Sequence, residues 1–309
     1  MAQFEVPMKR GERLLLEGQF RAAQKRALRD ETEQRIRDHG RRVRRSGAAA
    51  KFRAAAQRSL DFLAVGDSWF DYPLDDSGWP SLYDHSIIGE YNLQSMGNPN
   101  PIILSFAHYG WASTQVLTYE NQDQIIENIQ GGSWTNGSGP DAILASFGGD
   151  DIAGDQLAIY LTYGGQSNAP SARFQGVLDS VQASYQDLFA LRDIYAPNVP
   201  VFGQCYDYAI PDGVAANAFF GPWLKPSFDF ALYEGAVAAT LVVHDMIDQF
   251  YQMLNGLASN PAYNFHVVDT RGTITPNDWA NELHPMSDGF NKLAQKLLSA
   301  LQAYFPGQI

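Results

Sequence analysis

The sequence predicts an α/β fold, a three-layer α/β/α sandwich built around a five-stranded parallel sheet. From residue 60 onward, short apolar segments alternate with longer helical segments, and each apolar segment ends in glycine or polar residues. Strands that are buried on both faces of a parallel sheet have this continuous apolar character. Alternation of strand and helix produces right-handed crossovers with helices on both faces. The expected strands are residues 60–65, 101–107, 141–147, 199–206 and 264–269.

The segments between these strands supply the expected helices, and the composition is that of a folded domain. Hydrophobic residues make up 45% of the 309 residues and charged residues 18%, which is typical of a soluble globular protein. No apolar stretch approaches the roughly 20 residues that span a bilayer, and the start of the chain has no secretory signal pattern. We therefore expect a cytoplasmic protein. The expected helices are residues 114–129, 174–194, 228–257 and 287–305.

Residues 1–58 differ in composition from residues 59–309, and we expect them to form a basic helical arm beside the main domain. The arm has a net charge of +9 and the main domain a net charge of −21. Arg, Ala, Glu and Gln dominate the arm and favour a helix, which Gly40 and Gly47 are expected to interrupt. The charge asymmetry indicates docking on the acidic domain or recruitment of an acidic partner. Docking is favoured, because no nucleic-acid-binding motif accompanies the basic residues.

The single cysteine and the acidic loop narrow the kinds of site that the chain can hold. Cys205 excludes a disulfide within the chain, and its apolar strand favours a buried structural thiol. Asp150, Asp151 and Asp155 are potential ligands for Mg²⁺ or Ca²⁺, but a solvated acidic loop is the favoured interpretation. The sequence has no phosphate-binding loop and no dinucleotide-binding motif. We therefore expect neither a metal nor a cofactor.

Residues suited to chemistry follow the expected strands, where sites of parallel α/β folds lie. Ser68 follows the first strand in a Gly-Asp-Ser turn, and Gly110 follows the second. Gly148 opens the segment Gly-Gly-Asp-Asp after the third strand, which places Asp150 at a strand end. His284 precedes a proline before the last helix, and proline restricts the preceding residue to an extended conformation. These positions suit a nucleophile, a backbone donor and a general base.

Together these four segments resemble the sequence blocks of the SGNH (GDSL-like) hydrolases over roughly residues 60–305. The resemblance equates Ser68 with the nucleophile, Gly110 with the glycine of the second block and His284 with the histidine of the last block. Asp150 lies where the family has asparagine. Four longer segments also resemble those of an uncharacterised bacterial branch of the superfamily. These segments are GDSWFDYP, GGDDIAGD, YDYAIPDG and WANELHP.

The resemblance implies a serine esterase that cleaves short acyl esters or O-acetyl groups on carbohydrate. His284 would take a proton from Ser68, which attacks the acyl carbonyl. The N–H groups of Ser68 and Gly110 and the side chain at 150 would hold the oxyanion. The alternative is a catalytically weak or inactive protein of the same fold that serves in binding.

Two positions depart from the family pattern. Asp150 replaces an amide that donates to the oxyanion, and an ionised carboxylate has no proton to donate. Asp150 therefore predicts impaired catalysis unless its pKa is strongly raised. Asn281 occupies the aligned position of the triad acid, three residues before the histidine. The alternatives for the triad acid are Glu282, Asp278 and Asp269.

Aromatic residues accompany the predicted site and suggest a substrate cleft. Such side chains bind acyl or aryl groups or stack on sugar rings. The expected substrate-binding residues are Trp69, Tyr109, Trp111, Asp207 and Trp223.

Overall fold

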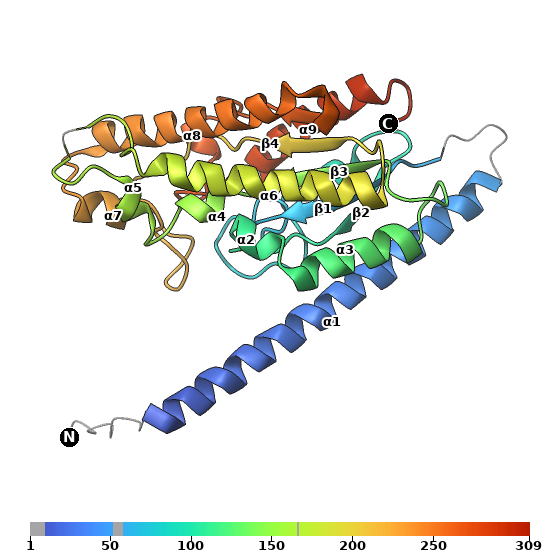
Figure 1. Ribbon diagram of the computed structural model, residues 1–309, viewed down its shortest axis with the longest axis horizontal. Coiled ribbons are helices and arrows are strands. Elements are labelled where there is room, and N and C mark those ends of the chain that lie inside the picture. Colours follow the sequence, from blue (N-terminus) through green and yellow to red (C-terminus); the bar gives the residue numbers. More distant parts are fainter. Residues whose placement is uncertain (1–9, 52–57, 166) are drawn as a thin grey trace.

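A computed structural model describes residues 10–51, 58–165 and 167–309 of the chain (Figure 1). Within these residues the strands form one five-stranded sheet in the order β2-β1-β3-β4-β5, and every neighbouring pair is parallel. The predicted fold class is therefore confirmed, and it is the fold that the resemblance to SGNH hydrolases implies. The strands are β1 (Asp61–Gly66), β2 (Ile102–Ser105), β3 (Ala142–Ser146), β4 (Val201–Gln204) and β5 (Phe265–Val268).

The centre of the sheet is apolar on both faces, as its position between helix layers requires. Every residue of β1 and β3 is buried, and Leu63 of β1 lies in register with Ile143 of β3 and Leu104 of β2. Burial of such side chains contributes about 25 cal/mol per Å² of apolar surface removed from water. Strand β1 therefore ends at a fixed position in the core, and the turn that follows it is held in place.

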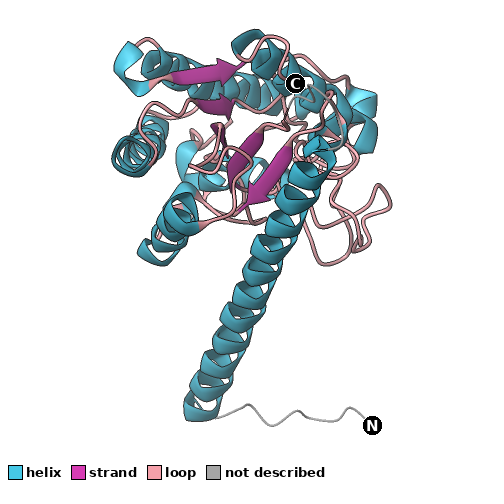
Figure 2. Cartoon of the chain, turned by 90° about the vertical axis from the view of Figure 1, so that its right-hand side faces the viewer, coloured by secondary structure: helices cyan, strands magenta, loops and turns pink. Residues whose placement is uncertain are grey.

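The main helices form two layers around the sheet, as Figures 1 and 2 show. On one face α3 packs against α6, and α6 packs against α8, while α9 contacts the short helix η1 and strand β5. These four helices are α3 (Tyr119–Gly131), α6 (Phe174–Tyr195), α8 (Ala236–Ala258) and α9 (Ser287–Tyr304). The short helices are η1 (Leu93–Ser95), α4 (Gly149–Ile152), α5 (Leu157–Tyr160), η2 (Pro261–Tyr263) and η3 (Pro276–Asp278).

Two of the expected helices are each divided into two. The segment 114–129 becomes α2 (Ser113–Val116) and α3, because the Thr118 side chain accepts from the backbone N–H of Asn121 and starts a new helix. The segment 228–257 becomes α7 (Lys225–Phe230) and α8. Leu232 (φ 63°) and Gly235 (φ 88°) adopt left-handed conformations between them, which a right-handed helix does not tolerate.

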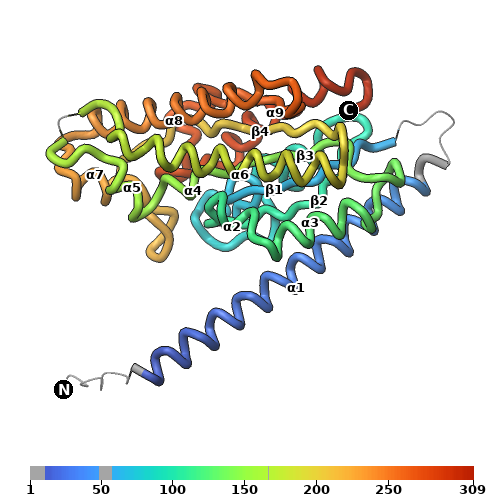
Figure 3. The backbone as a smooth tube through the Cα atoms, in the orientation of Figure 1, coloured from blue at the N-terminus to red at the C-terminus, as the bar shows by residue number. Residues whose placement is uncertain are grey.

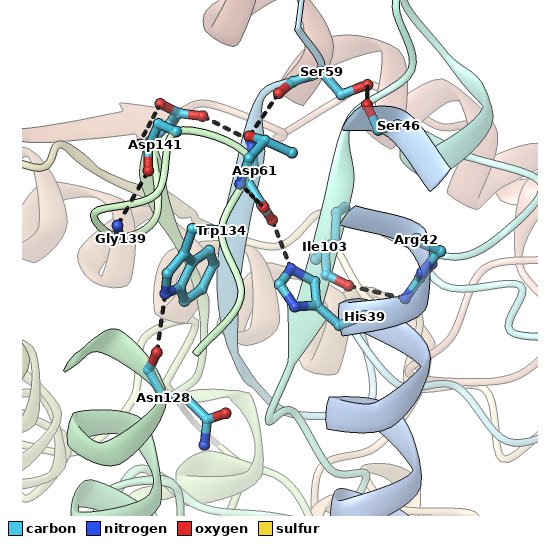
Figure 4. Close-up of polar contacts among 12 residues, drawn as sticks. His39, Arg42, Ser46, Ser59, Asp61, Ile103, Asn128, Trp134, Gly139 and Asp141 are labelled. Atoms are coloured by element: carbon cyan, nitrogen blue, oxygen red, sulfur yellow. Dashed lines mark hydrogen bonds and ion pairs between the residues drawn. The ribbon is translucent and has the colours of Figure 1, made fainter. Parts of the chain in front are cut away.

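Residues 10–51 of the basic arm form one uninterrupted helix, α1 (Arg10–Lys51), so the predicted breaks at Gly40 and Gly47 are wrong. The helix continues because its second half packs on the sheet, with His39 buried against Asp61 of β1 (Figure 4). A glycine lowers helix stability by only about 1 kcal/mol, which such contacts offset. The N-terminal half of α1 extends beyond the rest of the molecule (Figures 1 and 3).

Two further observations concern the single cysteine and the apolar character of the helices. Cys205 is buried directly after β4, and burial raises the pKa of its thiol to about 11. The thiol is therefore protonated at ordinary pH, as a structural cysteine would be. No helix among the described residues has the length and apolar character to cross a membrane.

Candidate active site

Ser68 lies in a tight turn that directly follows β1. The backbone N–H of Asp67 donates to the carbonyl of Ser146 (2.8 Å), and the N–H of Phe70 donates to the carbonyl of Asp67 (3.0 Å). Gly66 is needed here, because a Cβ atom would lie 2.4 Å from the Ser146 carbonyl oxygen. The close pairing of β1 with β3 therefore holds the turn at the carboxyl edge of the sheet.

His284 faces Ser68 from the loop before α9. Its Nε2 atom lies 2.8 Å from the Ser68 hydroxyl oxygen, and both residues are buried. This distance is that of the hydrogen bond between a general base and the hydroxyl it activates. The two residues are 216 positions apart in the chain, so the pairing depends on the complete fold.

Asn281 holds the imidazole ring. Its side-chain oxygen accepts from the backbone N–H groups of Leu283 (3.1 Å) and His284 (3.0 Å) and lies 3.1 Å from Nδ1 of His284. An acceptor at that place favours the tautomer with its proton on Nδ1, which leaves a lone pair on Nε2 for the Ser68 proton. Tyr72 stacks on the ring at 4.5 Å, and its hydroxyl accepts from Asn281 at 3.1 Å.

Burial lowers the pKa of His284 to about 3. The ring is therefore neutral at every ordinary pH and available as a base. An amide orients the ring as a triad carboxylate does, but it adds no negative charge to stabilise the imidazolium.

Each of the three alternatives for the triad acid is hydrogen-bonded to other groups. Asp278 binds Thr275 and Lys292, and the hydrogen bond from Lys292 lowers its pKa to about 2. Asp269 binds Arg271, whose hydrogen bond lowers the pKa of that carboxyl. Glu282 is fully buried, and its two oxygens accept from the backbone N–H groups of Gly213, Trp223, Leu224 and Lys225.

Glu282 instead ties the loop of Trp223 to the loop of His284, and this role is testable. Glu282→Gln replaces one acceptor oxygen by an NH₂ group that faces N–H donors. We expect the free energy of unfolding to fall by about 3 kcal/mol, because buried donors lose their partner. Denaturant titration measures this change, with the exposed Glu234→Gln as the matched control. Equal stability of the two variants would contradict the structural role.

Gly110 and Asp150 line the same cavity as Ser68 and His284, which has a volume of about 170 Å³. Gly110 has φ +75°, a left-handed conformation that glycine adopts without strain, so its loop can present a bare N–H. Asp150 lies in the first turn of α4, directly after β3. The structure thus brings together the four residues that the sequence blocks single out.

The side chain of Asp150 is surrounded by conditions that favour its protonated form. Burial raises the pKa of Asp150 well above its ordinary value, and the charges of Asp67 and Asp151 raise it further. Asp67 accepts from the Tyr206 hydroxyl (2.5 Å), the Trp69 N–H (3.0 Å) and the Ser146 hydroxyl. Desolvation raises the pKa of Asp67 to about 7, and these donors oppose that rise because they favour its charged form, whereas burial and the neighbouring charges all raise the pKa of Asp150.

The predicted substrate-binding residues divide into two groups. Tyr109 and Trp223 line the cavity. Trp69 is buried and donates to the Leu283 carbonyl, Asp207 accepts from three backbone N–H groups of residues 272–274, and Trp111 packs on His108. These last three residues are not among those that line the cavity.

The cavity also contains residues outside the expected substrate-binding set. Tyr72 and Pro73 end the segment GDSWFDYP and Leu74 follows it directly, so closeness to Ser68 in the chain was the available signal for these three. Phe220 comes from a loop with no such marker. The additional lining residues are Tyr72, Pro73, Leu74 and Phe220.

No protein-family model matches the chain, and no curated protein matches it. Solved structures do show similarity. A lipase from a goat rumen metagenome is 17% identical, with 78% of this chain and 97% of that chain covered and a TM-score of 0.49. A family 3 carbohydrate esterase from Clostridium thermocellum is 18% identical, with 80% and 99% covered and a TM-score of 0.42. An extracellular lipase from Streptomyces rimosus is 16% identical, with 78% and 100% covered and a TM-score of 0.46.

At these identities and TM-scores the likeness carries no argument about the reaction. The five-stranded parallel sheet, with Ser68, Gly110 and Asp150 after β1, β2 and β3, agrees with the fold that the sequence resemblance implies. The geometry of Ser68, His284, Gly110 and Asp150 indicates the chemistry that this site can perform.

Proposed function

We propose that this protein is a serine esterase that cleaves short-chain acyl esters through an acyl-enzyme on Ser68. The observation that carries the proposal is the 2.8 Å contact between the Ser68 hydroxyl and the neutral, amide-oriented His284. A serine in this contact loses its proton to the imidazole as it attacks a carbonyl carbon. No carboxylate is required for the proton transfer itself, since Asn281 already fixes the tautomer.

The oxyanion of the tetrahedral intermediate is stabilised by donors that line the same cavity. The N–H groups of Ser68 and Gly110 supply two of them, and the protonated carboxyl of Asp150 supplies the third. A carboxylic acid kept neutral by its site acts as a donor in the same way in ketosteroid isomerase. The imidazolium of His284 then protonates the departing alcohol, and water attacks the acyl-enzyme with His284 again as base.

The direct test is hydrolysis of p-nitrophenyl acetate together with labelling by a fluorophosphonate, which reacts with activated serines. We expect turnover, and a single adduct that peptide mass spectrometry places on Ser68. Turnover without an adduct, or an adduct on another serine, would remove Ser68 from the mechanism. Absence of both would favour the alternative of an SGNH-fold binding protein.

The small cavity predicts selectivity for short acyl groups. A volume of about 170 Å³ lies below the size of most drug-sized ligand pockets, and Leu74 and Phe220 are among the apolar residues that line it. We expect kcat/KM to fall by at least about tenfold from the butyrate to the dodecanoate ester, because each additional buried group has to displace a side chain. Comparison of p-nitrophenyl esters measures this selectivity.

Phe220→Ala should widen the cavity and recover part of the activity toward the longer esters. Phe219→Ala is the matched control, because Phe219 is the neighbouring phenylalanine, is 88% exposed and is not part of the cavity lining. If the two variants share the parent's chain-length profile, Phe220 does not limit the acyl group.

A further inference from the structure

Arg35 of α1 contacts two of the loops that carry the proposed catalytic groups. Its Nη1 atom donates to the backbone carbonyl of Ala107 (2.7 Å), and its Nη2 atom donates to the carboxylate of Asp71 (2.7 Å). Asp71 lies three residues after Ser68, and Ala107 lies three residues before Gly110. One guanidinium group therefore joins the turn of the nucleophile to the loop of the second oxyanion donor.

The contacts of Asp71 continue from this bridge toward the site. Its second oxygen lies 3.4 Å from Nδ1 of His108, and the His108 ring packs on Tyr109, which lines the cavity, at 4.3 Å. The residue next to Asp71 is Tyr72, whose ring stacks on His284. Two residues of the cavity lining, Tyr72 and Tyr109, are thus adjacent in the chain to Asp71 and His108 of the Arg35 network.

Contacts between α1 and the sheet fix the position of this guanidinium group. His39 of α1 is buried and binds Asp61 of β1 (2.7 Å), as Figure 4 shows, and α1 packs against β2. The side chains of Arg35 and Asp71 are only 25% and 15% exposed. A planar guanidinium has several donors in a rigid fork, and it can therefore bridge two acceptors that a lysine ammonium holds less specifically.

We propose that Arg35 is a positioning residue for the oxyanion hole, and that α1 is part of the active-site scaffold rather than a separable arm. The inference rests on the proposed esterase function. Removal of Arg35 frees the two loops to move relative to each other and shifts the N–H donors of Ser68 and Gly110. A shift of about 1 Å in such a group lowers the rate by roughly 100-fold.

The test is steady-state hydrolysis of p-nitrophenyl acetate by Arg35→Ala in the full-length chain. We expect kcat to fall about 10- to 100-fold while KM changes less than about threefold, because the donors act mainly in the transition state. Arg35→Lys should recover part of the loss, since it restores the charge without the fork. Asp71→Asn removes the partner charge and should lower kcat in the same direction, which keeps the test open if Arg35→Ala does not fold.

Arg42→Ala is the matched control. Arg42 lies on the same helix and also donates to a backbone carbonyl and to a side chain of the domain, Gln94, but neither lies in a catalytic loop. We expect its kcat within about twofold of the parent, even where its melting temperature falls as much as that of Arg35→Ala. Parental kcat in Arg35→Ala, or equal losses in both arginine variants, would overturn the positioning role. Equal hydrolysis by the parent and Ser68→Ala would instead remove the proposed function itself.

Discussion

Ser68→Ala is expected to lower kcat for ester hydrolysis by on the order of 10⁶-fold, the size of the loss when the serine of subtilisin is removed. The variant lacks the oxygen atom that forms the acyl-enzyme. What remains is general-base catalysis by the neutral ring of His284. The alanine fits the turn, because the Ser68 hydroxyl contributes little volume. Loss of activity should therefore occur without loss of stability.

The measurement compares kcat with p-nitrophenyl acetate, and thermal unfolding serves as the check on folding. Ser59→Ala is a suitable control, since Ser59 is similarly buried (7%, against 8% for Ser68) but lies at the opposite end of β1. Its activity should equal that of the parent. Residual hydrolysis by Ser68→Ala within tenfold of the parent would show that another group carries the reaction.

Asp150→Asn is expected to change the pH dependence of kcat/KM more than it changes the maximum value of kcat/KM. Asp150 donates to the oxyanion only when protonated, and burial beside Asp67 and Asp151 raises its pKa. Activity of the parent is therefore present below that raised pKa and is lost as the pH rises through it. His284 remains neutral above a pH of about 3, so it does not limit activity over the same range. Asparagine donates at every pH, and the alkaline loss should disappear.

The profile of kcat/KM against pH reports the ionisations of the free enzyme and so measures this difference directly. At acidic pH the parent and Asp150→Asn should differ by less than about tenfold, whereas at alkaline pH the variant should exceed the parent by about 100-fold or more, the contribution of one oxyanion donor. Asp155→Asn, which alters an exposed carboxylate of the neighbouring loop, should leave the profile unchanged. A parent that gains activity steadily with pH would show that Asp150 does not act as an acid.

Much of the site can be predicted from the sequence because it is encoded locally. Ser68 is placed by the few residues that end β1, and Gly110 and Asp150 are placed in the same way by β2 and β3. In a parallel sheet the carboxyl ends of adjacent strands lie at one edge, and alternation of strand and helix is sufficient to bring these residues together. Asn281 and His284 share one short loop, which is also a local relation.

Other roles depended on contacts that no local pattern contains. Asp207 and Glu282 are carboxylates near the predicted cleft, yet each accepts backbone N–H groups of a distant loop. Trp69 follows the nucleophile directly, but the pleat and turn direct it into the core rather than into the cavity. Helix propensity also predicted breaks in the arm at Gly40 and Gly47, and packing on β1 and β2 outweighs that weak preference.

The sequence by itself determined the fold class and the placement of Ser68, Gly110 and Asp150 after successive strands, since each depends on hydrophobic periodicity or on residues adjacent in the chain. The family resemblance added the proposal that Ser68 is the nucleophile and His284 the base. Only the tertiary structure decided the burial of Asp150 beside Asp67 and Asp151, which raises its pKa, and the place of Arg35. A pKa depends on burial and on charges brought close in space, and Asp67 lies 83 positions from Asp150. The Arg35 bridge likewise joins segments that are distant in the chain and become neighbours only when α1 packs against the edge strand β2.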